Sequence, residues 1–509
     1  MSETPSYSRA ERTVETVTAA LALLAALPVL RLIVHAIAAR IAYPGDLEWM
    51  EGATLVSAMR VRDGLPLYGE PAGDYVPFIY PPLYAWIVGA LSHVFPLGYA
   101  LGRGVSTACT IVAGGALVFA ARKEGASWML SLSTLGLFAA VWDDSGTFFD
   151  LCRTDSLSLA LAGWAVVLTP LPSRRATIAG GLLLALAFTA KQHVALLGVP
   201  MLAWVWRTHG RQRAMTFAVA SVVPALLFVG AMSIATDSRF LTWLVRVPAA
   251  HGQTLSRLVP GAQFEVWKAL PISTTAALLA GTWLWKRSYW SMVSGMTLVI
   301  VSIMRGHTGG YLNVLIPMMW LQCLLPIVAA NAFGGPRARS VAALVVAAQL
   351  LFWRTDYGRL LPALRAGKPV VAAWQGAQLD PRRYVPTQTD VANMQNVIAE
   401  ISRLPDPILI PHAPFYAVMA GKRPSFALIA LWDIDHVGGA LKLGVATVDD
   451  AIAHDFRSAV LPDDKLGHGF TDHWAKKGSI GASAPSTRTG WPVRLRYVYM
   501  PKVEAPTGG

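Results

Sequence analysis

Apolar stretches separated by short polar or basic loops make up the first 354 residues of the chain. A helix needs about 20 apolar residues to cross a bilayer, and shorter stretches require tilting or a locally thinned membrane. The pattern predicts a mostly α-helical, polytopic membrane bundle with about eleven spans. The expected spans cover residues 16–39, 103–121, 126–142, 154–170, 176–190, 192–206, 213–235, 266–285, 288–304, 311–330 and 339–353.

Lysine and arginine placement predicts the side on which each loop lies, because basic loops stay in the cytoplasm. Basic loops alternate along the chain with loops that are not basic, so the basic ones are all expected on the cytoplasmic side. Arg9 and Arg12 place the N-terminus on that side too. These loops are Arg122-Lys123, Arg174-Arg175, 207–213, Lys286-Arg287 and 337–339. The external side then receives the first loop, everything after Arg354, and the loops over 143–153, 236–265 and 305–310.

This alternation requires that the apolar segment 79–97 does not cross the membrane. We expect residues 81–95 to form a juxtamembrane helix along the outer interface, with Tyr80, Tyr84 and Trp86 at headgroup depth. A normal second span, with one other helix miscounted, is the alternative.

After residue 354 the apolar stretches give way to prolines, charges and short strand-like runs. Strands are expected at 408–410, 458–461 and 493–500, and a helix at 393–403. We therefore divide the chain into a transmembrane module, 1–354, and a soluble α/β domain, 355–509, which is large enough to hold its own core.

Composition supports a membrane protein. Hydrophobic residues make up 54% of the chain and charged residues 14%, whereas soluble domains carry about 25% charged residues. The net charge of +13 is placed largely in short loops, so nucleic acid is not an expected partner. Three cysteines exclude a disulfide framework and a cysteine-based zinc site.

Three carboxylates follow the first span within six residues: Asp46, Glu48 and Glu51. The three-residue step from Glu48 to Glu51 places both on one face of a helix. Carboxylates just outside a membrane segment are typical of a reaction site at the bilayer surface, and an ordinary solvated loop is the alternative.

Other polar residues are expected on the same external face. They are Asp150, Arg153, Asp155, Lys191, His193, Arg305, His307, Tyr311 and Asn313. A carboxylate can take a proton from an attacking hydroxyl, and a cation can neutralise a phosphate leaving group. Lys191 could instead snorkel at the end of a span. In the external domain, hydrated surface residues rather than metal ligands are expected at His412, Asp433, Asp435, His436, His454, Asp463 and Asp464.

The order of these motifs resembles the GT-C superfamily of glycosyltransferases, and most closely the bacterial branch that includes aminoarabinose transferases and protein O-mannosyltransferase-like enzymes. The motifs that carry the resemblance are the acidic first loop, G-x-P-L-Y at 64–68, Y-P-P-L-Y at 80–84, Arg103 with Ser106, R-T-D at 153–155, A-K-Q at 190–192 and a late external domain.

The resemblance implies a glycosyltransferase that takes a sugar from polyprenyl phosphate and inverts the anomeric centre. An acid of the first loop (Asp46, Glu48 or Glu51) would be the general base, and Asp155 the second acid. The family's Lys-Pro-Pro-Leu is Tyr80-Pro81-Pro82-Leu83 here, so other groups must bind the donor phosphate. The implied phosphate ligands are Arg103, Lys191, Arg305 and Tyr311, and the implied pocket residues are Tyr80, Tyr84, Arg153, His193 and His307.

The resemblance further implies a multi-pass protein of the bacterial inner membrane, with the reaction outside and a lipid, glycan or protein as acceptor. The resemblance assigns no cofactor, and it leaves open whether a divalent cation binds. The rival interpretations are a lipid or polysaccharide transporter or flippase without transferase activity, and a membrane-anchored assembly protein. Transporters often show inverted repeats, and none is visible in this sequence.

Overall fold

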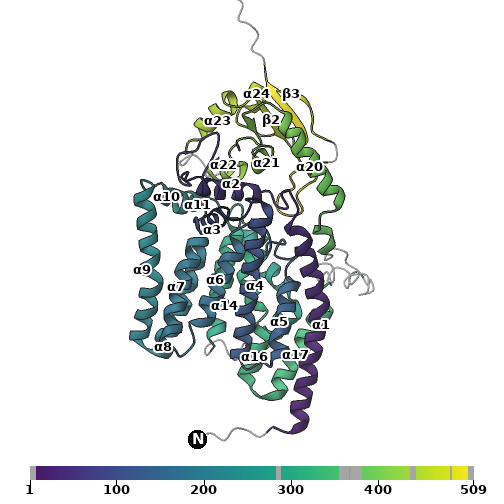
Figure 1. Cartoon of the computed structure of the whole chain (residues 1–509). Coiled ribbons are helices and arrows are strands. Elements are labelled where there is room, and N and C mark those ends of the chain that lie inside the picture. Colours follow the sequence, from purple (N-terminus) through teal and green to yellow (C-terminus); the bar gives the residue numbers. More distant parts are fainter. Residues whose placement is uncertain are drawn as a thin grey trace, which may run out of the picture.

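The computed structural model describes residues 7–281, 288–354, 366, 381–435, 443–481 and 484–502. A helical bundle lies beneath a smaller domain built from late residues (Figure 1). The main elements of the bundle are α1 (Arg9–Ile41), α4 (Tyr99–Lys123), α5 (Trp128–Ala140), α6 (Asp155–Leu168), α7 (Arg174–Ala190), η1 (Gln192–Leu197), α8 (Gly198–His209), α9 (Arg211–Ala235), α12 (Ala262–Ala269), α13 (Pro271–Gly281), α14 (Tyr289–Gly306), η4 (Leu312–Leu315), α15 (Ile316–Gln322), α16 (Leu325–Phe333) and α17 (Gly335–Leu351).

Helix occurs in each stretch where a span is expected. Four helical stretches are long and apolar enough to cross a membrane, namely Arg9–Ile41, Tyr99–Lys123, Arg211–Ala235 and Leu312–Phe333, and shorter apolar helices accompany them. The chain is thus an integral membrane protein. The count of eleven crossings stays a prediction, because several helices are short or interrupted, as at Leu270 between α12 and α13.

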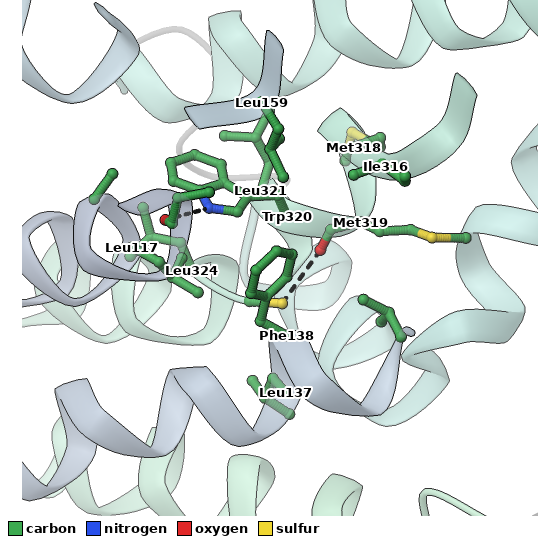
Figure 2. Close-up of a cluster of buried hydrophobic side chains, with 14 of the residues drawn as sticks. Leu117, Leu137, Phe138, Leu159, Ile316, Met318, Met319, Trp320, Leu321 and Leu324 are labelled. Carbon is green, nitrogen blue, oxygen red and sulfur yellow. Dashed lines mark hydrogen bonds between the residues drawn. The ribbon is translucent and has the colours of Figure 1, made fainter. Parts of the chain in front are cut away.

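The bundle has a packed interior and a lipid-facing side. Trp320 and the neighbouring side chains in Figure 2 form part of the interior, where Trp320 Nε1 donates to Ala113 O over 3.0 Å. In contrast, α9 leaves Leu226, Leu227 and Ile234 63%, 68% and 84% exposed. Apolar side chains at such positions fit a helix that is solvated by lipid.

The end of the bundle away from the smaller domain carries the N-terminus of α1 (Figure 1). Arg337 and Arg339 bind Glu11 and Glu15 there, with N–O distances of 3.0 and 2.6 Å. The N-terminus and the 337–339 loop therefore share one side, as the charge pattern predicts. The loop Lys286-Arg287 lies outside the described residues.

Two short helices of the first loop, α2 (Glu51–Arg62) and α3 (Leu83–Leu91), lie between the bundle and the smaller domain (Figure 1). At about 1.5 Å per residue the nine residues of α3 span about 14 Å, too little to cross a bilayer. This agrees with the expected juxtamembrane helix. Between α9 and α12 the chain forms α10 (Arg239–Leu241), η2 (Thr242–Arg246), α11 (Val247–Ala250) and η3 (Arg257–Gly261).

The smaller domain, called the external domain below, has a four-stranded mixed sheet in the order β1-β2-β4-β3. Ile408 pairs with Ser458 in parallel, and Ala459 pairs with Tyr499 antiparallel. Its elements are η6 (Pro381–Tyr384), α20 (Gln388–Arg403), β1 (Ile408–Leu409), α21 (Phe415–Met419), α22 (Leu428–Asp435), α23 (Val445–His454), β2 (Ser458–Leu461), α24 (Phe470–His473), β3 (Trp474–Ser479) and β4 (Tyr497–Pro501).

Sequence pattern located most of this sheet. The strand expected at 493–500 begins further along the chain, as β4 (Tyr497–Pro501). Strand β3 was not expected, because its sequence WAKKGS is mostly polar and exposed. The start of the external domain at residue 355 lies outside the described residues and stays a prediction.

Candidate active site

Glu51 and Arg103 form a buried ion pair at the centre of the first loop, and neither side chain is exposed to solvent. Arg103 Nε and Nη2 donate to the two carboxylate oxygens over 2.9 and 2.6 Å. The other three N–H groups of Arg103 donate to backbone carbonyls, those of Arg40, Tyr43 and Gly45. All five donors of the guanidinium are therefore used within the protein.

Glu51 is equally occupied, since it also accepts from the backbone N–H groups of Leu47 and Cys152 over 2.7 and 2.8 Å. Burial alone would raise the pKa of Glu51, but Arg103 and these N–H groups outweigh burial and lower the pKa below its usual range. This geometry favours a structural role for Glu51 and Arg103 over proton transfer and phosphate binding.

Glu48 has a less complete environment. Its Oε2 accepts from Arg153 Nη1 over 2.7 Å and from Met50 N over 3.2 Å. Its Oε1 forms no hydrogen bond with the residues that the structure describes. Burial raises the pKa of Glu48 to about 7 against the opposing effect of Arg153. A carboxylate with a pKa near neutrality is suited to general base catalysis.

Asp46 faces the external domain. Its backbone N–H donates to the Tyr416 hydroxyl over 2.9 Å, and its Oδ1 accepts from Gly52 N over 2.8 Å. Burial and the neighbouring Glu51 raise the pKa of Asp46 well above its usual range. A raised pKa disfavours the ionised form that a general base needs, and Glu48, which Arg153 binds, is the better candidate of these two acids.

Asp155 is the first residue of α6, and its Oδ1 accepts from Lys191 Nζ over 2.6 Å and from Asn313 Nδ2 over 2.8 Å. Its Oδ2 has no hydrogen-bond partner among the described residues. Lys191 follows the end of α7, so three distant segments meet at this acid. Asp155, Lys191, Asn313 and His193 line one cavity.

A second cavity is lined mainly by aromatic and apolar side chains, with Arg153 as the charged group. Tyr80 contributes to this wall, and the guanidinium carbon of Arg153 lies 5.9 Å from the centre of its ring. Since Arg153 and Thr154 line this cavity and Asp155 lines the previous one, the two cavities flank the 153–155 segment. Glu48 reaches the same segment through Arg153.

A segment of the external domain, Arg488 to Gly490, covers Glu48. The backbone N–H groups of Arg488 and Thr489 donate to Leu47 O over 2.7 and 3.1 Å, and Thr489 Oγ1 donates to Gly146 O over 2.7 Å. A Cβ on Gly490, whose φ is +70°, would lie 2.9 Å from Glu48 Cγ. This cover leaves Glu48 only 2% exposed.

Four further predicted site residues have partners of their own. Arg305 binds both carboxylate oxygens of Glu265 over 2.7 Å and donates to Gly310 O, so its guanidinium is largely occupied. The Tyr84 hydroxyl donates to Gly102 O over 2.8 Å. His307 Nε2 lies 3.0 Å from Pro248 O. Tyr311 packs against Phe148, and its hydroxyl lies 3.4 Å from Thr489 Oγ1.

Three features of this region were not predicted from the sequence. Arg40 forms a fully buried ion pair with Asp150 over 3.0 Å. The Arg488–Gly490 segment carries no local signal for a role near the first loop. Asp433 was expected to be a hydrated surface residue, and this expectation was wrong, because the residue is 5% exposed where α22 packs against α11; His436, from the same expected set, lies outside the described residues. Among the described residues, no three His, Cys, Asp or Glu side chains gather as a metal site.

No protein-family model matches the chain, and no curated protein matches it in sequence. Solved structures share its fold. Crystallised ArnT from Cupriavidus metallidurans bound to undecaprenyl phosphate is similar over 97% of this chain and 99% of its own, with a TM-score of 0.53 and 14% identity. The apo state of ArnT matches over 97% and 98%, with a TM-score of 0.51 and 15% identity. The GT-C resemblance predicted from the sequence is thus confirmed at the level of the fold.

Proposed function

We propose that this protein is a glycosyltransferase that transfers a sugar from a polyprenyl phosphate to an acceptor hydroxyl. The reaction takes place at the outer face of the inner membrane. The observation that carries the proposal is the meeting of Glu48–Arg153 and Asp155–Lys191 at two adjoining cavities, on the fold that ArnT uses with undecaprenyl phosphate bound. Acids and cations drawn from distant segments suit chemistry on a phosphate-linked sugar.

Glu48 acts as the general base in this mechanism. Its carboxylate takes the proton of the acceptor hydroxyl while that oxygen attacks the anomeric carbon. The bond from the anomeric carbon to the phosphate oxygen breaks, and the polyprenyl phosphate leaves with the electron pair. Attack opposite to the leaving group inverts the anomeric centre.

Lys191 and Arg153 neutralise the phosphate as it leaves, because they are the cations that line the two cavities. Arg103 and Arg305 are committed to Glu51 and Glu265, so they hold the first loop and the 305–310 turn in place instead. Asp155 orients Lys191, and His193 and Tyr80 complete the walls of the cavities.

The test is incubation of the purified protein in detergent with a panel of polyprenyl-phosphate hexoses and pentoses and candidate lipid, glycan and peptide acceptors. Release of free polyprenyl phosphate together with a glycosylated product is the expected result. Glu48→Gln should lower the rate by roughly 100- to 10,000-fold, the range measured for general acid–base groups. Asp46→Asn is the matched control and should retain most of the rate.

A transporter gives a different result in the same system. Movement of the sugar lipid across vesicles without release of the carrier would contradict the proposal and favour a flippase. Transfer that survives Glu48→Gln but not Asp46→Asn would keep the transferase and reassign the base.

A further inference from the structure

The end of the bundle away from the external domain carries arginines from two neighbouring turns. The turn between α6 and α7 leads into Arg174 and Arg175, and the turn between α8 and α9 leads into Arg211 and Arg213. Arg174, Arg175 and Arg211 are exposed, and Arg213 is half-buried. These four residues are called the basic patch below.

Side-chain contacts hold the two turns together. Arg213 Nε donates to Thr177 Oγ1 over 2.9 Å, and its Nη2 donates to Leu171 O over 3.4 Å. His209 Nε2 lies 3.4 Å from Pro170 O. The arginines of both turns therefore belong to one surface of the protein.

The positive charge of the basic patch is not balanced by acids in the described chain. The sequence has no aspartate or glutamate between Asp155 and Asp237, and none of the four arginines forms an ion pair with the residues that the structure describes. The 337–339 loop at the same end differs, because its arginines bind Glu11 and Glu15. An unbalanced cluster of cations attracts an anionic partner.

Apolar side chains beside the basic patch face lipid. Met215 and Val219, about one and two turns into α9 from Arg211, are exposed, and so is Trp206 near the end of α8. Exposed apolar side chains on a membrane-spanning helix contact acyl chains, and tryptophan is enriched at the level of the lipid headgroups. The arginines therefore lie at the depth of the phospholipid phosphates.

The basic patch lies at the membrane surface opposite to the candidate active site. Helix α7 begins at the patch with Arg174 and ends at Ala190, beside Lys191 (Figure 1). Its 17 residues span about 26 Å at about 1.5 Å per residue, close to the roughly 30 Å of the hydrocarbon core. A ligand of the patch is thus distinct from the substrate of the proposed reaction.

We propose that the basic patch binds the phosphate headgroup of an anionic phospholipid, whose acyl chains lie along the exposed face of α9. Arginine suits this partner, because a guanidinium can donate two parallel hydrogen bonds to one phosphate. Each basic residue near an anionic membrane surface strengthens the attraction about fivefold. This interaction goes beyond the proposed glycosyltransferase function and does not depend on it.

Native mass spectrometry of the full-length protein in detergent tests the site. The probes are phosphatidylglycerol and phosphatidylcholine with identical acyl chains, and inorganic phosphate. Wild type should prefer phosphatidylglycerol, and Arg174→Gln/Arg175→Gln should weaken that binding about 25-fold, at about fivefold for each arginine. Arg211→Gln, in the other turn, should cost about fivefold. Arg174→Lys/Arg175→Lys keeps the charge and should retain most of the affinity.

The matched control is Arg9→Gln/Arg12→Gln, which removes the same charge at the same end of the bundle. These arginines lie on α1, across the bundle from α9, where salt screens their effect on the patch, so the affinity for phosphatidylglycerol should stay close to that of wild type (Figure 1). Equal loss in both double variants would reveal general charge attraction and overturn the site. Equal binding of the two lipids by wild type would mean that the arginines only orient the helices, and displacement of phosphatidylglycerol by millimolar inorganic phosphate would exclude a lipid-specific site.

Discussion

Two acids of the first loop, Glu48 and Glu51, each form an ion pair with an arginine. The two pairs differ in how many of their hydrogen-bonding groups have a partner. In Glu51–Arg103 the carboxylate and the guanidinium are saturated by each other and by backbone groups. In Glu48–Arg153 one carboxylate oxygen stays without a hydrogen bond from the described residues, and the arginine faces a cavity. A saturated pair fixes the backbone, whereas an unsaturated one can exchange partners with a substrate. Satisfaction of hydrogen bonds, rather than charge, distinguishes the two pairs.

Breaking the saturated pair should have the largest effect on stability. Glu51→Ala leaves Arg103 buried without its counter-charge, and such changes cost about 3–5 kcal/mol. Thermal unfolding in detergent measures the loss of stability. A variant that yields little folded protein would show the largest loss. Arg153→Ala, at the unsaturated pair, is the control and should destabilise less. Equal destabilisation by the two variants would contradict the distinction.

Removing the cation of the unsaturated pair should act on the reaction. Arg153→Met keeps much of the side-chain volume and removes the positive charge beside the cavity, so we expect turnover to fall by roughly 100-fold. The unfolding temperature should change little compared with Glu51→Ala. Product formation under saturating donor measures the effect, and a variant with wild-type turnover would exclude Arg153 from charge neutralisation.

The pH profile should report Glu48. With a pKa of about 7, the base is ionised above neutrality, so activity should rise about tenfold per pH unit below 7 and level off above it. Stability has the opposite dependence. The folded protein holds this proton more tightly than the unfolded chain, so the contribution is present at low pH and lost as the pH rises toward 7. Glu48→Gln should remove this part of both profiles.

The smallest effect is expected at the cover over Glu48. Gly490 has a φ of +70°, and a Cβ there would lie 3.0 Å from Glu48 Oε1. Gly490→Ala should therefore cost about 1 kcal/mol of stability and lower turnover a few-fold. Gly478→Ala is the control, because a Cβ at Gly478 has no neighbour within 4 Å. Identical turnover in the two variants would argue against contact between the cover and the base.

The length and composition of the apolar segments were enough to predict the helices of the bundle, because the bilayer imposes a minimum length. Counting basic loops also placed Asp155 and Lys191 on one side, and they form an ion pair in the structure. Which acid pairs with which arginine could not be predicted, since Glu48 and Glu51 differ only in tertiary partners. The contacts of Thr489 with Leu47 and Gly146 could not be predicted, because they depend on how a late domain packs onto an early loop.

The position of Arg488–Gly490 in the chain has a consequence for biogenesis. Glu48 is translated early, whereas the segment that covers it is translated hundreds of residues later, which at about 5–20 residues per second takes roughly 20–90 s. During that interval the first loop lacks this cover. The contact of this segment with Leu47 can form only after nearly the whole chain has been made, and a ribosome stalled before residue 488 leaves Glu48 without this cover.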